Sequence, residues 1–130
     1  MPSDYAMPFS DFLGVELIEV TPERVVARMK VRPELCTRPA VLHGGAVMAL
    51  ADTLGGVATV ANLAAGQWTT TIESKTNFLA AVPEGETATA ECTALHRGKT
   101  TMVWQTKISR EDGRIAAYVT QTQLVLAPLV

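Results

Sequence analysis

The longest apolar run of the chain, from Gly44 to about Ala65, constrains its fold most. Between residues 38 and 73 the only ionisable side chains are His43 and Asp52. The run contains no proline, is too long for a strand and is rich in alanine, leucine and methionine, so it predicts one helix that is stopped by Gly66. Because the run is apolar all round, we expect this helix to be enclosed by the rest of the protein.

The composition is that of one globular domain spanning residues 1–130. Of the 130 residues, 48% are hydrophobic and 18% are charged, and the formal net charge of −2 argues against nucleic acid as a partner. The N-terminal residues lack the cationic start and apolar core of a signal peptide, and a carboxylate inside the apolar run argues against a membrane span. Cys36 and Cys92 form no CxxC motif and no disulfide framework, so a cytoplasmic protein is expected.

Segments of alternating apolar and polar residues flank the predicted helix. Two precede it and four follow it, and a further short helix is expected around residues 5–12. The predicted strands cover residues 15–21, 25–31, 69–80, 86–96, 100–110 and 114–126. Four consecutive strands after one buried helix predict an α+β fold, in which an antiparallel sheet wraps around that helix.

The alternation also assigns side chains to the two faces of the sheet. Over residues 25–31 it places the valine, alanine and methionine at odd positions on one face and the charged residues on the other. Over residues 69–80 it places Thr71 with Glu73 on one face and Ser74 on the other. Cys92 is predicted to point inward.

The start of the helix carries two glycines. Gly44 and Gly45 leave backbone N–H groups unshielded at the positive end of the helix, where they could stabilise a carbonyl that becomes negative. The alternative is that the glycines only form a tight turn from strand to helix.

Asp52 is the other conspicuous residue of the run. A buried carboxylate costs several kcal/mol unless it is paired or functional. It could make a structural hydrogen bond, to Thr53, Thr59 or a strand hydroxyl, or it could act chemically. Eight residues separate it from Gly44, about 12 Å along a helix, so one ester or thioester carbonyl cannot reach both on the same helix. If both act on one carbonyl, they come from different subunits of a two-fold dimer with antiparallel helices.

A second glycine pair, Gly55 and Gly56, lies one turn beyond Asp52. Glycine inside a helix costs about 1 kcal/mol relative to alanine. The pair could leave room for a partner helix or a ligand beside the carboxylate, or it could only allow tight packing against the sheet.

The motif HGG at residues 43–45, with an aspartate nine positions after the histidine, is followed on the next predicted strand by TTTIESKTNFLAAVPEG. Together with the FLGVELIEV opening and the HRGKTTMVWQTKI hairpin, these motifs resemble the hotdog-fold acyl-CoA thioesterases, specifically the PaaI-like branch of phenylacetate degradation. The resemblance extends over nearly the whole chain. It implies the hotdog fold, hydrolysis of an acyl-CoA thioester, and active sites formed between subunits.

The same resemblance implies roles for a catalytic set. Gly44, beside Gly45, supplies the N–H that polarises the thioester carbonyl. Asp52 of the facing subunit acts as the nucleophile or as the base that orients water. A strand hydroxyl, from Thr71 or its neighbour Thr70, helps place that water, and His43 orders the loop rather than acting as a base.

The resemblance also implies substrate contacts, with two departures from the family pattern. Thr37 stands where the family often has an asparagine or glutamine that contacts the thioester or the acid, and Gly56 stands where some relatives carry a hydroxyl. Arg97 and Lys99 match positions where relatives place cations for the coenzyme A phosphates, although either could be a solvated surface charge. The side chains expected to line an apolar acyl pocket are Met48, Phe78, Leu79 and Met102.

The expected partners are an acyl-CoA substrate and further copies of the chain, as a dimer or a dimer of dimers. No separate cofactor is expected, because coenzyme A is part of the substrate. No metal site is expected either, since the two histidines lack a metal-binding motif. A non-catalytic acyl-CoA-binding protein of the same fold is the alternative function.

Overall fold

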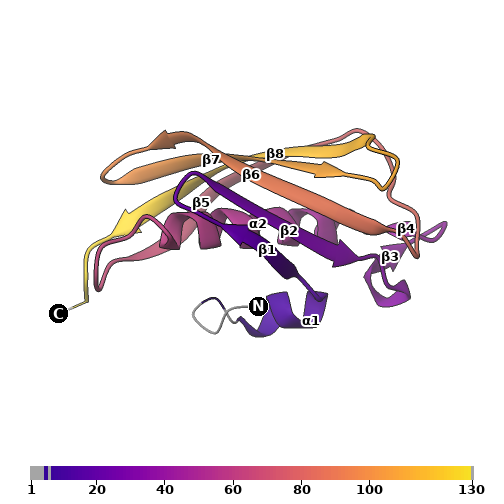
Figure 1. The fold of residues 1–130 in the computed structure, drawn as a ribbon, viewed down its shortest axis with the longest axis horizontal. Helices are drawn as coiled ribbons and strands as arrows, with labels where there is room; N and C mark the ends of the chain where they lie inside the picture. Colours follow the sequence, from indigo (N-terminus) through magenta and orange to yellow (C-terminus); the bar gives the residue numbers. More distant parts are fainter. Residues whose placement is uncertain (1–4, 6, 130) are drawn as a thin grey trace.

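The computed structural model describes Tyr5 and residues 7–129. One antiparallel sheet covers a long helix, α2, which lies along one face of the sheet (Figure 1). This arrangement confirms the predicted fold class. The elements in chain order are α1 (Pro8–Leu13), β1 (Glu16–Val20), β2 (Arg24–Lys30), a 3₁₀ turn (Pro33–Leu35), β3 (Cys36–Thr37), β4 (Val41–Leu42), α2 (Gly44–Val60), β5 (Trp68–Phe78), β6 (Thr87–Arg97), β7 (Thr101–Ser109) and β8 (Ile115–Leu126).

The strand order leaves β5 at an edge of the sheet. The six strands follow one another as β1-β2-β6-β7-β8-β5, and every neighbouring pair is antiparallel. β5 follows α2 in the chain but pairs with β8, the last strand, and the chain then crosses back to start β6 beside β2. Within the described residues, β5 therefore offers an unpaired backbone edge along its 11 residues.

The core lies between α2 and the inner face of the sheet. Small inward side chains on β2 and β6, including Ala27, Ala88 and Ala90, are fully buried and let the helix approach closely. The odd positions of β2 and Cys92 on β6 point inward, as the alternation predicted. Trp104, on β7, fills the space beside the second half of the helix and is 0% exposed.

The second helix is not enclosed all round, contrary to the expectation from its composition. Met48 is 39% exposed and Val60 is 44% exposed. Asp52 is also exposed, and Gly56 is half-buried. These four residues follow one another at intervals of four, so they form one stripe along the helix. Because Met48 and Val60 of this stripe are exposed apolar side chains, the rest of the protomer does not cover this face of the helix.

Helix α2 ends at Val60, so the prediction that it extends to Ala65 is wrong. The Asn62 side chain donates to the Ala58 carbonyl at 2.9 Å and to the Pro22 carbonyl at 2.8 Å, and this binds the last turn to the β1–β2 connection. Gly66, with a φ of 80°, forms a separate turn before β5. The short first helix also differs from its predicted range, because Pro8 occupies its first turn and sets its start.

A β-bulge interrupts the alternation of β5. The register with β8 shifts between Thr71 and Glu73, so Thr71 shares the inner face with Ser74 rather than with Glu73. The predicted faces were therefore wrong beyond Thr71. An extra residue, Ile72, is accommodated at the bulge, and this keeps the Thr71 hydroxyl directed toward α2.

A hydrogen bond between Thr59 and Trp104 joins the end of α2 to the sheet. The Trp104 indole N–H donates to Thr59 Oγ1 at 2.9 Å, and both side chains are fully buried. Thr59→Val keeps the shape but leaves the indole N–H without an acceptor, so we expect a loss of about 1–3 kcal/mol in the free energy of unfolding. Urea denaturation measures this loss. Thr93→Val, on the outer face of β6, is the control; an equal loss in the two variants would contradict the account.

Candidate active site

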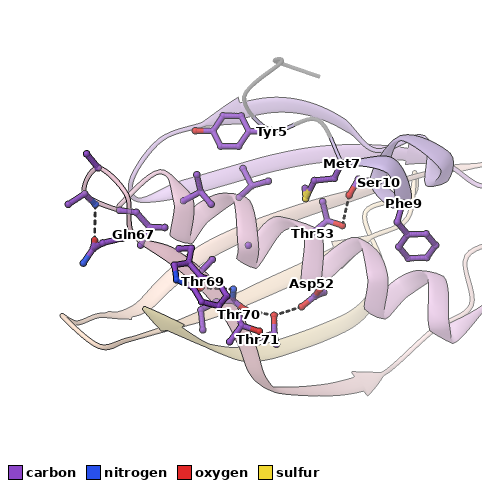
Figure 2. A pocket seen from close by; sticks show the side chains of 18 residues that line it. Tyr5, Met7, Phe9, Ser10, Asp52, Thr53, Gln67, Thr69, Thr70 and Thr71 are labelled. Atoms are coloured by element: carbon purple, nitrogen blue, oxygen red, sulfur yellow. Dashed lines mark hydrogen bonds between the residues drawn. The ribbon is translucent and has the colours of Figure 1, made fainter. Parts of the chain in front are cut away.

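The Asp52 carboxylate is bound through one of its two oxygens. Oδ1 accepts a hydrogen bond from the Thr71 hydroxyl at 2.7 Å (Figure 2). It accepts another from the Gln121 amide at 3.2 Å. Oδ2 accepts no hydrogen bond from the residues that the structure describes. Of the partners that the sequence suggested for Asp52, the structure therefore shows the strand hydroxyl, which is that of Thr71. The anchored carboxylate keeps one oxygen free for a substrate or water.

The two threonines of α2 that were the other candidate partners of Asp52, Thr53 and Thr59, make hydrogen bonds elsewhere. Thr59 accepts from Trp104. The Thr53 hydroxyl donates to the Ala49 carbonyl at 2.8 Å and lies 3.1 Å from the Ser10 hydroxyl (Figure 2). Since the Thr53 proton is used in the helix, Ser10 is the donor of that second bond. The bond holds α1 against α2 next to the carboxylate.

Gln121 and Gln123 complete the polar cluster and were missed in the sequence. They are 1% and 2% exposed, and the Gln121 Nε2 donates to Gln123 Oε1 at 3.1 Å. The Thr71 hydroxyl also lies very close to Gln123 Oε1. A signal was available, because the alternation over residues 115–126 places both glutamines on the same inner face as Val119. Two amides on an apolar face indicate a buried polar network.

At the start of α2, His43 is the N-cap. Its Nδ1 accepts the Gly45 N–H at 2.8 Å, so Gly45 is already paired. The Gly44 N–H has no acceptor among the described residues, and a Cβ at Gly44 would lie 3.3 Å from the Phe78 ring. This geometry presents one free N–H, that of Gly44, beside an aromatic side chain.

A cavity of about 840 Å³ opens beside Asp52. Its polar end contains Asp52, Thr71 and Gln123, and it extends past the second half of α2 toward α1 and the start of β5 (Figure 2). Its apolar wall is formed by Val57, Val60, Leu63 and Trp68, and the predicted substrate contacts Gly56 and Thr70 also line it.

The other predicted contacts lie outside this cavity. Met48 is exposed on the first half of α2, and Phe78 is exposed at the end of β5, next to Gly44. Thr37 is exposed on β3. Leu79 is exposed and Met102 is buried in the core. None of these side chains lines the cavity beside Asp52.

The two cations predicted for coenzyme A also lie outside the cavity. Arg97 contacts the Asn62 amide oxygen at 3.2 Å and Glu23 at 3.8 Å, so its guanidinium connects β6 to the end of α2. Lys99 is exposed in the β6–β7 hairpin. Their contact with coenzyme A stays a prediction.

The two adjacent glycines of α2 serve different purposes. A Cβ at Gly55 would lie 2.2 Å from Gln121 Cδ, so this glycine permits tight packing against the sheet. A Cβ at Gly56 would meet nothing within 4 Å, and the residue opens onto the cavity. Tight packing against the sheet thus holds for Gly55, whereas a ligand or partner helix beside Gly56 stays a prediction.

Thiol chemistry has little support in the structure. Burial raises the pKa of the Cys92 thiol to about 11, and burial, with a smaller effect of Glu84 and Glu34, raises the pKa of the Cys36 thiol. Both thiols are therefore poor sources of thiolate at neutral pH.

Among the described residues, no group of three or more histidine, cysteine or acidic side chains could hold a metal ion. In the same part of the chain, no helix is long and apolar enough to cross a membrane.

The polar cluster around Asp52 and the free N–H of Gly44 both lie on α2, the helix that the sheet covers. Comparison with known sequences shows that residues 40–117 match the thioesterase superfamily. The chain belongs to this family and has its hotdog fold. It is a thioester hydrolase. Among curated relatives, it is 29% identical over 110 residues to the 1,4-dihydroxy-2-naphthoyl-CoA hydrolase of Listeria monocytogenes, covering 84% of this chain and 88% of the relative.

Solved structures show the same fold. The chain superimposes with a TM-score of 0.87 and 30% identity on a Q49A mutant of the thioesterase PA1618 from Pseudomonas aeruginosa, covering 93% of this chain and 86% of that one. It superimposes at 0.80 and 25% identity on a hypothetical thioesterase protein with coenzyme A from Streptococcus pneumoniae, with coverages of 89% and 88%. The Escherichia coli PaaI protein gives 0.86 at 23% identity, with coverages of 94% and 86%, and shares the fold.

The N-cap geometry predicts the effect of changing His43. His43→Ala removes the acceptor of the Gly45 N–H and should lower stability by about 1 kcal/mol. His43→Asn restores an N-cap acceptor without an imidazole, so it should keep both stability and thioester hydrolysis close to those of the wild type. Thermal unfolding and thioester assays on the two variants measure this. Loss of hydrolysis in a stable His43→Asn protein would show that the imidazole itself takes part in the reaction.

Proposed function

We propose that the protein hydrolyses an acyl-CoA thioester to the free acid and coenzyme A, at a site that two subunits build together. The observation that carries this proposal is the Asp52 carboxylate, which is anchored through Oδ1 by two donors and has Oδ2 free at the mouth of a largely apolar cavity. A family of thioester hydrolases, a relative named as an acyl-CoA hydrolase and a structural neighbour with coenzyme A support the substrate class.

The reaction needs an electrophilic carbonyl and a nucleophile. The Gly44 N–H, at the positive end of α2, stabilises the oxygen that becomes negative in the tetrahedral intermediate. Asp52 delivers the oxygen nucleophile to the thioester carbon, either its own Oδ2 or a water that it deprotonates. The carbon–sulfur bond then breaks and coenzyme A leaves as the thiolate. If water attacks, this step gives the free acid directly. If Oδ2 attacks, it leaves a mixed anhydride on Asp52, which a water then hydrolyses to the free acid and the restored carboxylate.

The two groups come from different subunits in this proposal. Gly44 and Asp52 are separated by eight residues of α2, about 12 Å, which is too far for one carbonyl. A two-fold pairing that sets two α2 helices antiparallel brings each Gly44 to the Asp52 of the other copy.

The surface of the protomer supports such a pairing. The free edge of β5 offers unpaired backbone groups to a second copy, and Ile72 and Phe78 on that strand are 57% and 55% exposed. Helix α2 packs against β5, so its uncovered stripe lies beside the same edge. The hydrogen bond from Thr71 of β5 to Asp52 also joins the stripe to this strand.

The acyl group occupies the cavity beside Asp52. Its wall is apolar along the second half of α2, and Gly56 adds no side chain that would block the way from the carboxylate. Such a cavity accepts an aromatic or medium-chain acyl group by hydrophobic burial.

The carboxylate is tested by Asp52→Asn. The amide oxygen still accepts from Thr71 and Gln121, so the fold should persist, whereas the nucleophile or base is lost and CoA release should fall by about 10²–10⁴-fold. The assay follows free thiol over aromatic and medium-chain acyl-CoAs. Asp11→Asn, an exposed change on α1, is the control. Full hydrolysis in Asp52→Asn would contradict the mechanism, and acyl-CoA binding without turnover by the wild type would favour the binding protein instead.

The N–H of Gly44 is tested by Gly44→Pro. Proline is well tolerated at the first position of a helix, and His43, with φ −63° and ψ 137°, already has the extended conformation that must precede a proline. The change removes the donor and should lower kcat by about 10²–10³-fold. Gly44→Ala also brings a Cβ near Phe78 but keeps the N–H, so it should lose far less. Equal losses in the two variants would assign the effect to the side chain.

A further inference from the structure

A chain of amide hydrogen bonds connects Asp52 to the backbone of β8. The Thr69 hydroxyl donates to the Leu124 carbonyl at 2.9 Å, which uses its only proton. It therefore has to accept the bond from Gln123 Nε2, at 3.1 Å. This fixes the orientation of the Gln123 amide, because its nitrogen must face Thr69 and its oxygen must face Gln121.

The same logic fixes the orientation of the Gln121 amide. The Gln123 oxygen accepts from Gln121 Nε2, so the Gln121 nitrogen points into the cluster. That NH₂ group has two protons, and the second one reaches Asp52 Oδ1 at 3.2 Å. The single proton of the Thr71 hydroxyl has two acceptors within reach, Asp52 Oδ1 at 2.7 Å and Gln123 Oε1. Gln121 is therefore the donor that Asp52 does not share with another acceptor through the same proton.

The orientation of Gln121 leaves its own oxygen without a partner. Gln121 Oε1 is buried and accepts no hydrogen bond in the described part of the chain. A buried polar atom without a partner destabilises the folded state. The opposite orientation would place this oxygen against the carboxylate. The Gln121 amide is thus held in the orientation that donates a hydrogen bond to Asp52, although its own oxygen then has no donor.

Gly55 provides the space that this amide occupies. A Cβ at position 55 would lie 2.2–2.4 Å from the Gln121 amide atoms Cδ, Nε2 and Oε1. Any other residue at this position would push the amide away from Asp52, or the helix away from the sheet.

We propose that Gln121 is a positioning residue for Asp52, and that Gly55 and Gln123 hold its amide in the orientation that fixes the carboxylate. The proposal rests on the proposed function, because the positioned carboxylate is the one that attacks the thioester or activates water. It assigns catalytic importance to a glutamine that touches neither the substrate nor the reacting atoms.

The test separates positioning from a structural role by measuring kcat, KM and thermal stability together. Gln121→Met keeps the length of the side chain and removes both the donor and the unpaired oxygen. We expect kcat to fall about 10–100-fold, as for a misplaced catalytic group, with KM within about twofold, since substrate binding is untouched. The melting temperature should stay unchanged or rise. Gln105→Met, on the outer face of β7, is the control and should leave kcat unchanged.

A double-mutant cycle tests the role of Gly55. Gly55→Ala should lower kcat like Gln121→Met, because its Cβ displaces the amide. In a Gln121→Ala background the same Gly55→Ala change should lower kcat no further and should raise stability, since the amide that it would strike is gone. Additive losses of kcat across the cycle would overturn the link between the two residues.

The outcomes distinguish this proposal from the proposed function. If the wild type hydrolyses acyl-CoA and Asp52→Asn abolishes this, a full kcat in Gln121→Met would overturn the positioning role alone. A melting temperature that falls in step with kcat would also overturn it, because Gln121 would then only stabilise the fold. A wild type that releases no coenzyme A from any acyl-CoA would overturn the proposed function on which the inference rests.

Discussion

The hydrogen bond between Thr71 and the Asp52 carboxylate is the interaction on which the rest of the site depends. It joins the one acid of an apolar helix to an edge strand, and several irregular features of the fold serve it. The bulge at Ile72 keeps the hydroxyl turned inward, and Gly55 makes room for a second donor, Gln121. Because both donors meet Oδ1, the other oxygen of the carboxylate remains directed to the cavity.

Helix α2 sets the distance between the two groups to which we assign the proposed reaction, the Gly44 N–H and the Asp52 carboxylate. Its first residue offers an unpaired N–H, and its third turn carries the acid. One carbonyl can use both only if a second helix runs antiparallel beside the first. The uncovered stripe with Met48 and Val60, and the free edge of β5, supply the apolar surface for that second copy. The exposed acid of the protomer thus becomes an enclosed one in the proposed assembly.

The sequence was sufficient for the features that follow from periodicity and composition. The long helix, the sheet around it and the acid on the helix could all be predicted, and the family resemblance is confirmed. Other features depend on contacts between distant segments. The helix ends at Val60, where Asn62 binds the β1–β2 connection, and the faces of β5 change because of a bulge. The alternation of β8 could have placed Gln121 on the inner face, but its bond to Asp52 joins residues 69 positions apart, which no local pattern reveals.

The most direct test of the composite site is subunit mixing. In the proposed dimer, Asp52→Asn and Gly44→Pro should each abolish activity, since each change damages both sites. In a mixed dimer, one site combines the intact Gly44 of one copy with the intact Asp52 of the other. Refolding the two inactive proteins together should therefore restore about a quarter of the wild-type CoA release if subunits associate at random. The composite site would be contradicted if native mass spectrometry shows mixed dimers and the mixture is still as inactive as its components. In that case the Gly44 of one copy and the Asp52 of the other do not act on the same carbonyl.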